Sequence, residues 1–60
     1  MVVREAVALY DFQARTDREL SFKKGDSMTV FEKVSADWWD AVIKDQEGLI
    51  PDKYITLLSQ

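Results

Sequence analysis

The sequence of 60 residues contains no cysteine and no histidine, and it has only one proline and two glycines. Without cysteine the chain cannot be a disulfide-stapled miniprotein. Without either residue type, the usual zinc sites lack their ligands and nucleophile–base triads lack their base. We therefore expect no catalysis, no metal and no cofactor.

Long apolar runs and basic clusters are also missing. No stretch approaches the roughly 20 apolar residues that a membrane span requires, so we expect a soluble protein with no membrane association. The absence of cysteine is compatible with the cytoplasm, where we expect the protein to be. The net charge is -3, and the basic residues are scattered rather than gathered in a stripe, which argues against nucleic acid. An acidic surface instead favours basic partners.

Alternating apolar residues predict an all-β fold. We place strands at residues 5–10, 27–33, 38–43, 47–51 and 55–58, with one 3₁₀ turn at 52–54. The first strand is apolar on both faces, which in so small a chain suggests a sheet curled over itself as in a small barrel. Phe31 breaks the alternation and has no predicted place. The residues predicted to form the core are Leu20, Phe22, Met28, Val30, Ala41, Ile50 and Ile55.

Loops and turns occupy the remaining segments. Residues 11–19 are polar and aperiodic, so we predict a long exposed loop there, and long loops in compact domains are usually functional. Leu20 and Phe22 would tie its far end to the core. Gly25 is predicted to adopt a positive φ in a turn. Lys44-Asp45 occupies the place of a two-residue hairpin turn, so either Asp45 adopts the left-handed conformation or the turn is of another type.

The adjacent residues Trp38 and Trp39 lie in a predicted strand, where only one of the two indoles can be buried in the core. Neighbouring side chains of a strand point to opposite faces, so both indoles cannot enter the same core. Trp39 shares a face with the apolar Ala41 and Ile43, which makes Trp38 the outward indole. A chain this small has little apolar surface to spare, so an outward indole is best explained as a contact surface.

Four successive motifs resemble those of SH3 domains in order and spacing. They are Ala8-Leu9-Tyr10-Asp11-Phe12, Glu19-Leu20-Ser21-Phe22-Lys23-Lys24-Gly25-Asp26, Trp38-Trp39 and Gly48-Leu49-Ile50-Pro51-Asp52-Lys53-Tyr54-Ile55. The resemblance covers residues 5–58 and leaves 1–4 and 59–60 as short flexible tails. It implies a five-stranded, partly open barrel of two orthogonal antiparallel sheets. Some runs resemble slit-robo Rho GTPase-activating proteins and others spectrin, a mixture that also fits an engineered or consensus-like domain.

The resemblance also implies a function, because SH3 domains bind proline-rich PxxP peptides in the polyproline II conformation. By motif position, the apolar grooves would be formed by Tyr10, Phe12, Trp38, Pro51 and Tyr54. Asp17 and Glu19 would form an acidic pocket beside Trp38 for an arginine or lysine of the ligand. Arginine is favoured because its planar group can stack on the indole while it meets a carboxylate.

Three positions depart from the family pattern. Leu49 and Lys53 stand where many members have tyrosine and asparagine, and Phe12 replaces a second tyrosine. The first two changes would each remove a hydrogen bond to the ligand worth roughly 0.5–1.5 kcal/mol, although both residues stay in the predicted peptide-binding set. Arg18, among the loop acids, would repel a basic ligand or pair with Asp17.

The expected function is therefore that of a monomeric, noncatalytic interaction module of a larger signalling or cytoskeletal protein, with proline-rich segments as its partners. Two alternatives stay open. Small barrels also hold methylated lysine or arginine in aromatic cages, and a designed or model SH3 domain without a physiological ligand would carry the same motifs. More simply, the aromatic residues would be ordinary strand residues and the loop acids solvated charges.

Overall fold

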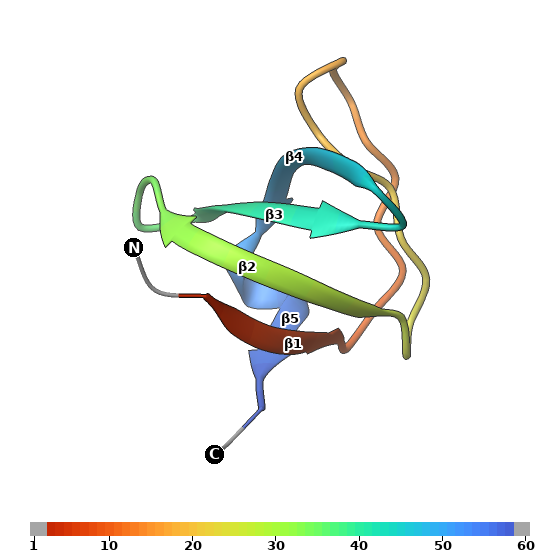
Figure 1. Ribbon diagram of the computed structural model, residues 1–60. Coiled ribbons are helices and arrows are strands. Elements are labelled where there is room, and N and C mark those ends of the chain that lie inside the picture. The colour runs from red at the N-terminus through yellow and green to blue at the C-terminus, as the bar shows by residue number, and fades with distance from the viewer. Residues whose placement is uncertain (1–2, 59–60) are drawn as a thin grey trace.

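The computed structural model describes residues 3–58 as five antiparallel strands with one 3₁₀ turn (Figure 1). The elements in order are β1 (Arg4–Ala8), β2 (Ser27–Lys33), β3 (Trp38–Ile43), β4 (Gln46–Pro51), η1 (Asp52–Tyr54) and β5 (Ile55–Leu57). The all-β class and the position of the 3₁₀ turn are confirmed. Of the predicted tails, residues 1–2 and 59–60 lie outside the described part. Within it, no helix has the length and apolar character needed to cross a membrane.

The strands form one ladder in the order β4-β3-β2-β1-β5. β2, β3 and β4 are a meander, and β1 joins this meander to the last strand by pairing with both β2 and β5. In Figure 1, β5 runs across the direction of β2 and β3, so the sheet curls over its own inner face. The curl creates one inner side, which holds the core, and one outer side.

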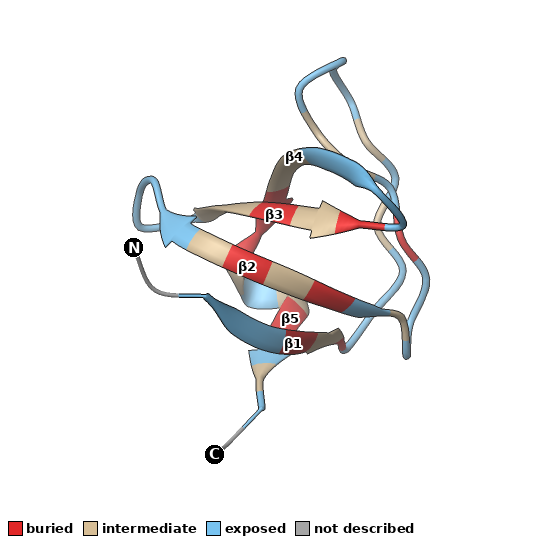
Figure 2. Cartoon of the chain, viewed as in Figure 1, coloured by how far each residue is buried: buried red, intermediate tan, exposed pale blue. Residues whose placement is uncertain are grey.

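Side chains on the inner side form a single core (Figure 2). Its buried residues are Ala6, Ala8, Phe22, Met28, Val30, Ala41, Ile43, Ile50 and Ile55. Every predicted core residue belongs to it except Leu20, which is partly buried and packs against it. Inward-facing and outward-facing residues alternate along each strand, with the period of two that a pleated sheet imposes.

The first strand needs two corrections. It ends at Ala8 rather than Tyr10, and only one of its faces is covered, since Val7 is half-buried and Leu9 is exposed. The reason is hydrogen bonding: the Leu9 N–H donates to the Tyr54 carbonyl (2.7 Å) rather than to a strand neighbour. This bond carries the chain off the sheet and toward η1.

A β-bulge explains why Phe31 broke the pattern. The β2–β3 register shifts between Val30 and Glu32: Val30 pairs with Ala41, but Glu32 already pairs with Asp40. Phe31 is the extra residue, which a bulge inserts into one strand without a partner. The bulge also restores the alternation beyond it, so that Glu32 and Asp40 lie on the outer side.

The turns adopt left-handed backbone where the sequence suggested it. Gly25 has φ 92°, and both Lys44 (φ 51°) and Asp45 (φ 70°) are positive. Ile43 pairs with Gln46 around them. Positive φ at both central residues of a two-residue hairpin defines a type I′ turn, so the first of the two alternatives for this turn holds and extends to Lys44 as well.

Candidate functional site

The long loop between β1 and β2 is an ordered hairpin. Phe12 and Phe22 form an isolated antiparallel bridge, each N–H donating to the other's carbonyl at 2.9 Å. Further out, the Ala14 N–H donates to the Ser21 hydroxyl oxygen at 2.9 Å. The loop tip extends beyond the barrel in Figure 1. Because its base is paired, the loop presents its side chains in a fixed arrangement.

The far arm of this loop is fastened to β4 through Leu49. The Leu49 N–H donates to the Arg18 carbonyl (2.8 Å), and the Leu20 N–H donates to the Leu49 carbonyl (3.0 Å). Glu19, between them, forms a parallel bridge with Leu49. Gly48 makes this approach possible, because a Cβ there would lie 2.8 Å from both the Arg18 carbonyl oxygen and the Leu20 Cγ.

Four of the predicted site residues form one chain of aromatic rings. Phe12 lies at its centre, with ring centroids 5.4 Å from Tyr54 and 6.3 Å from Trp38, and Tyr54 lies 5.8 Å from Tyr10. All three contacts are edge-to-face, the arrangement that ring quadrupoles favour. Phe12 also packs on the buried Phe22, at 5.5 Å, so the core holds the cluster from beneath while Tyr10 stays 58% exposed.

Trp38 and Trp39 differ in hydrogen bonding although both are half-buried. The Trp39 indole N–H donates to the Asp52 carboxylate at 2.7 Å, and the same carboxylate oxygen lies 3.7 Å from the Lys33 ammonium. The Trp38 indole N–H has no acceptor among residues 3–58, and its ring meets that of Phe12 edge to face. Trp39 is thus tied into the fold, whereas Trp38 keeps a donor free at the end of the ring chain.

The remaining predicted site residues on β4 and η1 have different exposures. Pro51 pairs with Trp38 across β3 and β4 but is buried, so most of its ring is covered. Leu49 is half-buried on the outer side of β4, and Lys53 is exposed within η1, directly before Tyr54. The backbone of Leu49 is hydrogen-bonded to the far arm of the loop, through Arg18 and Leu20.

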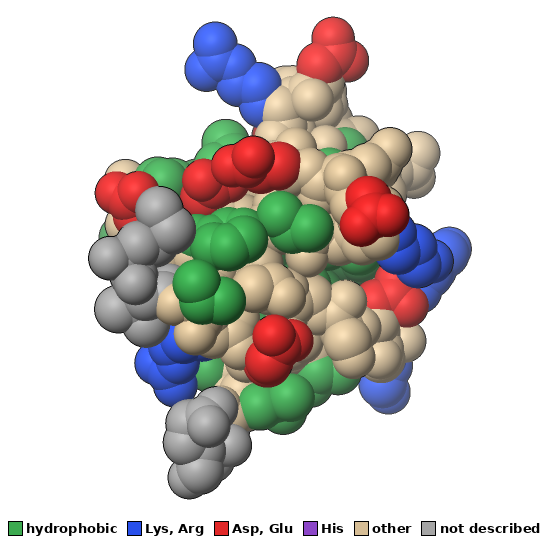
Figure 3. All heavy atoms as spheres, viewed as in Figure 1, with side chains coloured by type: hydrophobic (Ala, Val, Ile, Leu, Met, Phe, Trp, Pro, Cys, Tyr) green, Lys and Arg blue, Asp and Glu red, His purple; other side chains and the backbone are tan. Residues whose placement is uncertain are grey.

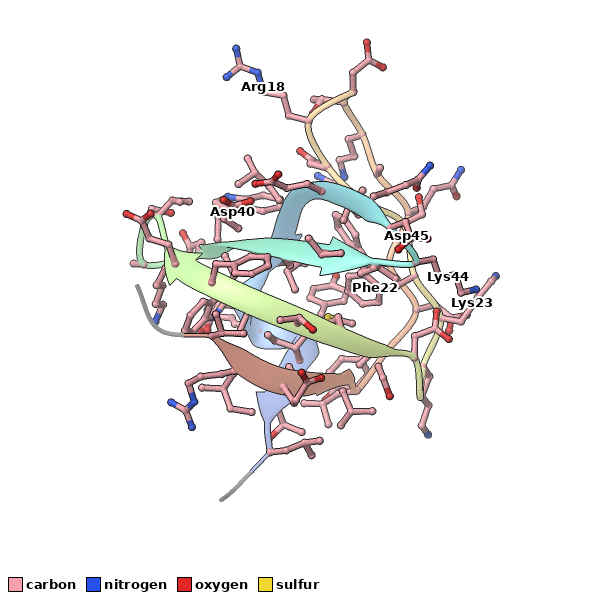
Figure 4. All side chains as sticks on the ribbon, in the orientation of Figure 1. Arg18, Phe22, Lys23, Asp40, Lys44 and Asp45 are labelled. Carbon is pink, nitrogen blue, oxygen red and sulfur yellow. The ribbon has the colours of Figure 1, made fainter. Side chains whose placement is uncertain are left out.

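The acidic residues of the loop are not equivalent. Glu19 is half-buried, and its Oε1 accepts a hydrogen bond from the Arg15 N–H at 2.9 Å, while Asp17 is exposed in the turn at the tip. Of the two alternatives for Arg18, pairing with Asp17 does not occur: Lys33–Asp52 is the only side-chain ion pair in the described part of the chain. Arg18 instead extends from the loop tip away from the barrel (Figure 4).

One acidic residue outside the predicted site set lies on the same face of β3 as Trp38. Asp40 follows Trp38 by two residues on β3 and pairs with Leu49, which in turn bridges to Glu19. Residues two apart on a strand share a face, so the alternation along the sequence was the signal that could have identified Asp40.

Two shallow hollows flank Phe12, one toward Tyr54 and Arg15, the other toward Phe22 and Lys44.

Comparison with known proteins assigns the chain to a family. The family model "SH3 domain" matches residues 7–52. The chain is 51% identical over 53 residues to the myosin ID heavy chain of Dictyostelium discoideum and 47% identical over 53 residues to SLIT-ROBO Rho GTPase-activating protein 2 of Danio rerio. Each alignment covers 88% of this chain but only 5% of the relative's length. The erythrocytic spectrin alpha chain 1 of Mus musculus is 43% identical over 58 residues, covering 93% of this chain and 2% of that one.

Solved structures agree with this assignment. The C-terminal SH3 domain of myosin IB from Entamoeba histolytica matches with TM-score 0.91 and 38% identity, covering 100% of this chain and 92% of that chain. The same domain bound to the EhFP10(GEF) peptide gives 0.90 and 39%, covering 98% of each chain. The Acanthamoeba myosin I SH3 domain bound to Acan125 gives 0.87 and 36%, covering 92% of this chain and 95% of that one. With its five-stranded barrel and a family match over most of its length, the chain belongs to the SH3 domain family.

Proposed function

We propose that the domain binds proline-rich peptides that carry a basic residue beside the proline-rich core. The observation that carries this proposal is the row of four aromatic rings that ends at Trp38, whose indole N–H has no acceptor among residues 3–58. The solved relatives bound to the EhFP10(GEF) peptide and to Acan125 support peptide recognition as the use of this surface.

Edge-to-face packing explains how such a surface would recognise polyproline II. Rings that meet edge to face leave shallow furrows between them, and a prolyl ring fits such a furrow with little loss of entropy because the ligand is already extended. Phe12 and Tyr54 would form one furrow and Phe12 and Trp38 the other. The Trp38 N–H would donate to a ligand carbonyl, and Glu19 and Asp17 would attract the basic residue.

The affinity should be modest. A shallow surface of this size lies at the low end of protein interfaces, so we expect micromolar binding, roughly -7 to -8 kcal/mol. Leu49 and Lys53 add no phenol or amide to the groove, which lowers the number of hydrogen bonds to the ligand rather than its buried apolar area.

We also propose that the domain is a noncatalytic, monomeric module of a larger cytoplasmic protein. The relatives named above are a myosin heavy chain, a Rho GTPase-activating protein and a spectrin chain. These names favour a cytoskeletal or signalling setting, in which the module brings its host protein to a proline-rich partner.

A methyl-lysine cage fits the geometry less well. An aromatic cage surrounds its cation with rings that stand apart from one another. Here the rings contact each other directly, with centroids 5.4 to 6.3 Å apart, so a methylammonium group has no space between them. A methylated peptide should therefore bind no better than its unmethylated form.

The proposal is tested by titrating a PxxP peptide with one flanking arginine into the parent domain and into Trp38→Ala. We expect micromolar binding to the parent and at least a tenfold loss in the variant, because a central aromatic anchor carries most of the energy of a small interface. Val3→Ala, which changes another exposed apolar residue, is the matched control and should bind as the parent does. Unchanged binding by Trp38→Ala would place the groove elsewhere.

A further inference from the structure

The outer side of β2, β3 and β4 is a sheet face that no element within residues 3–58 covers, and it adjoins Trp38. Strand register arranges its side chains in two rows. One row contains Glu5, Thr29, Val42 and Glu47, and the next contains Glu32, Asp40, Leu49 and Glu19. Laterally paired residues of a sheet point to the same face, so these side chains share one surface.

Every charged residue in these two rows is acidic. Two of the carboxylates are engaged within the fold, since Glu5 accepts from the Thr29 hydroxyl (3.2 Å) and Glu19 from the Arg15 N–H (2.9 Å). Glu32, Asp40 and Glu47 have neither a hydrogen bond nor an ion pair from their side chains within residues 3–58. Figure 3 shows this face: red side chains surround green ones near its middle, and blue ones lie toward its margins.

Apolar side chains lie between these acids. Val42 and Leu49 are half-buried, so each leaves part of its surface to solvent. Leu49 lies between Asp40 on one side and Glu19 on the other. Adjacent strands are about 4.8 Å apart, so Asp40 and Glu19 are separated by two such spacings, roughly 10 Å. A face with half-exposed aliphatic patches and unpaired carboxylates matches a segment that alternates apolar and basic residues.

This face is continuous with the ring cluster. Trp38, Asp40 and Val42 follow one another on the same side of β3, so the distance from the indole to Val42 is four residues, or about 13 Å of extended chain. A ligand segment of four or five residues that continues past Trp38 therefore reaches Glu47.

We infer that the peptide bound in the groove continues past Trp38 over this outer face, through a short segment of lysine or arginine alternating with an aliphatic residue. The inference rests on the proposed function. Ligand ammonium or guanidinium groups pair with Asp40 and Glu47, and the aliphatic side chain packs on Val42 and Leu49. The carboxylates of Asp40 and Glu47 then set the preference among proline-rich ligands, favouring those that continue with basic residues.

The test compares three kinds of peptide by calorimetry at low and high salt: a PxxP core with one arginine, the same core with a Lys-Leu-Lys-Leu extension, and the core with a Ser-Gly extension of equal length. Each extension is placed in turn at either end of the core, since one end alone passes Trp38. The protein variants are Asp40→Asn with Glu47→Gln, and the control Asp45→Asn. Asp45 is an exposed acid of the hairpin turn outside the two rows, and asparagine tolerates its positive φ.

Two exposed ion pairs should tighten binding about threefold to tenfold, so at one end the basic extension should exceed both other peptides by that factor at low salt. The double variant should lose this gain and still bind the core peptide within twofold of the parent, whereas Asp45→Asn should keep the gain. The inference is overturned if the basic extension binds no better than Ser-Gly at both ends, or if Asp45→Asn removes the gain as fully as the double variant does. Failure of the core peptide itself would instead overturn the proposed function, and this inference with it.

Discussion

At the scale of single residues, the two neighbouring indoles differ by one hydrogen bond within the fold. Trp39 donates to Asp52, which also faces the Lys33 ammonium, and so it links β3 to η1 and the end of β2. Trp38 makes no such bond and contacts Phe12 with its ring. Mutation of Trp39 should therefore destabilise the fold more than mutation of Trp38.

Trp39→Phe should lower the free energy of unfolding by about 1.5–3 kcal/mol, because a hydrogen bond to a charged, half-buried carboxylate is lost together with part of a packed ring. Trp38→Phe should lower it by less than about 1 kcal/mol, since its indole N–H has no acceptor to lose within the fold. Urea unfolding monitored by circular dichroism measures both. Equal destabilisation by the two variants would contradict the assignment of roles.

At the scale of elements, the loop between β1 and β2 owes its position to a glycine on β4. Gly48 lies on the inner side opposite Ala41, and the loop arm packs directly over it. Gly25, at the other end of the same loop, is needed for its backbone conformation, with φ 92° and open space where a Cβ would be. The two glycines therefore serve different physical purposes.

Gly48→Ala should destabilise the domain by about 1–3 kcal/mol through overpacking, and it should speed hydrogen exchange at the Leu20 and Leu49 amides that hold the loop arm to β4. Gly25→Ala should cost about 1–2 kcal/mol through backbone strain without that local exchange effect. Hydrogen exchange followed by NMR separates the two. If both variants protect Leu20 and Leu49 as the parent does, steric contact at Gly48 does not control the loop.

The β3–β4 hairpin offers a stabilising change. Lys44 and Asp45 both occupy positive φ, a conformation that Asn-Gly adopts with less strain. Replacing the pair with Asn-Gly should raise the free energy of unfolding by about 0.5–1 kcal/mol, measured by urea denaturation. Lys44→Val is the matched opposite change and should lower it, because a β-branched residue is poorly tolerated at positive φ. A neutral result for both would argue against the type I′ geometry.

At the scale of the whole molecule, a single small core supports the fold. Its fully buried side chains are few, with Ile50 and Val30 the largest, and a domain of this size buries only about 60% of the surface its unfolded chain exposes. Stability should therefore respond strongly to ligand, since any binding that is specific to the folded state adds directly to a small free energy.

A proline-rich peptide with a basic flank, at about one hundred times its dissociation constant, should raise the free energy of unfolding by about 2.7 kcal/mol. For a domain of 60 residues this corresponds to an increase in Tm of roughly 10–20 °C. Trp38→Ala binds at least tenfold more weakly, so the same peptide concentration should raise its free energy of unfolding by no more than about 1.4 kcal/mol. Thermal denaturation with and without peptide would measure the difference. An equal shift in parent and variant would mean that the peptide binds away from the ring cluster.

The sequence by itself determined the strands, the core and the identity of the outward indole, because a period of two is local and the hairpin turns leave few alternatives. It also determined the ring residues of the candidate site through the family resemblance. Tertiary structure alone decided where the first strand ends, how Phe31 is absorbed as a bulge, and that Pro51 is largely covered. It alone also brought Glu19, Leu49 and Asp40 side by side, since these residues belong to a loop and two strands and are neighbours only through pairing. The periodicity of one strand or loop specifies which of its residues face inward, but it does not specify which residues of other segments lie beside them.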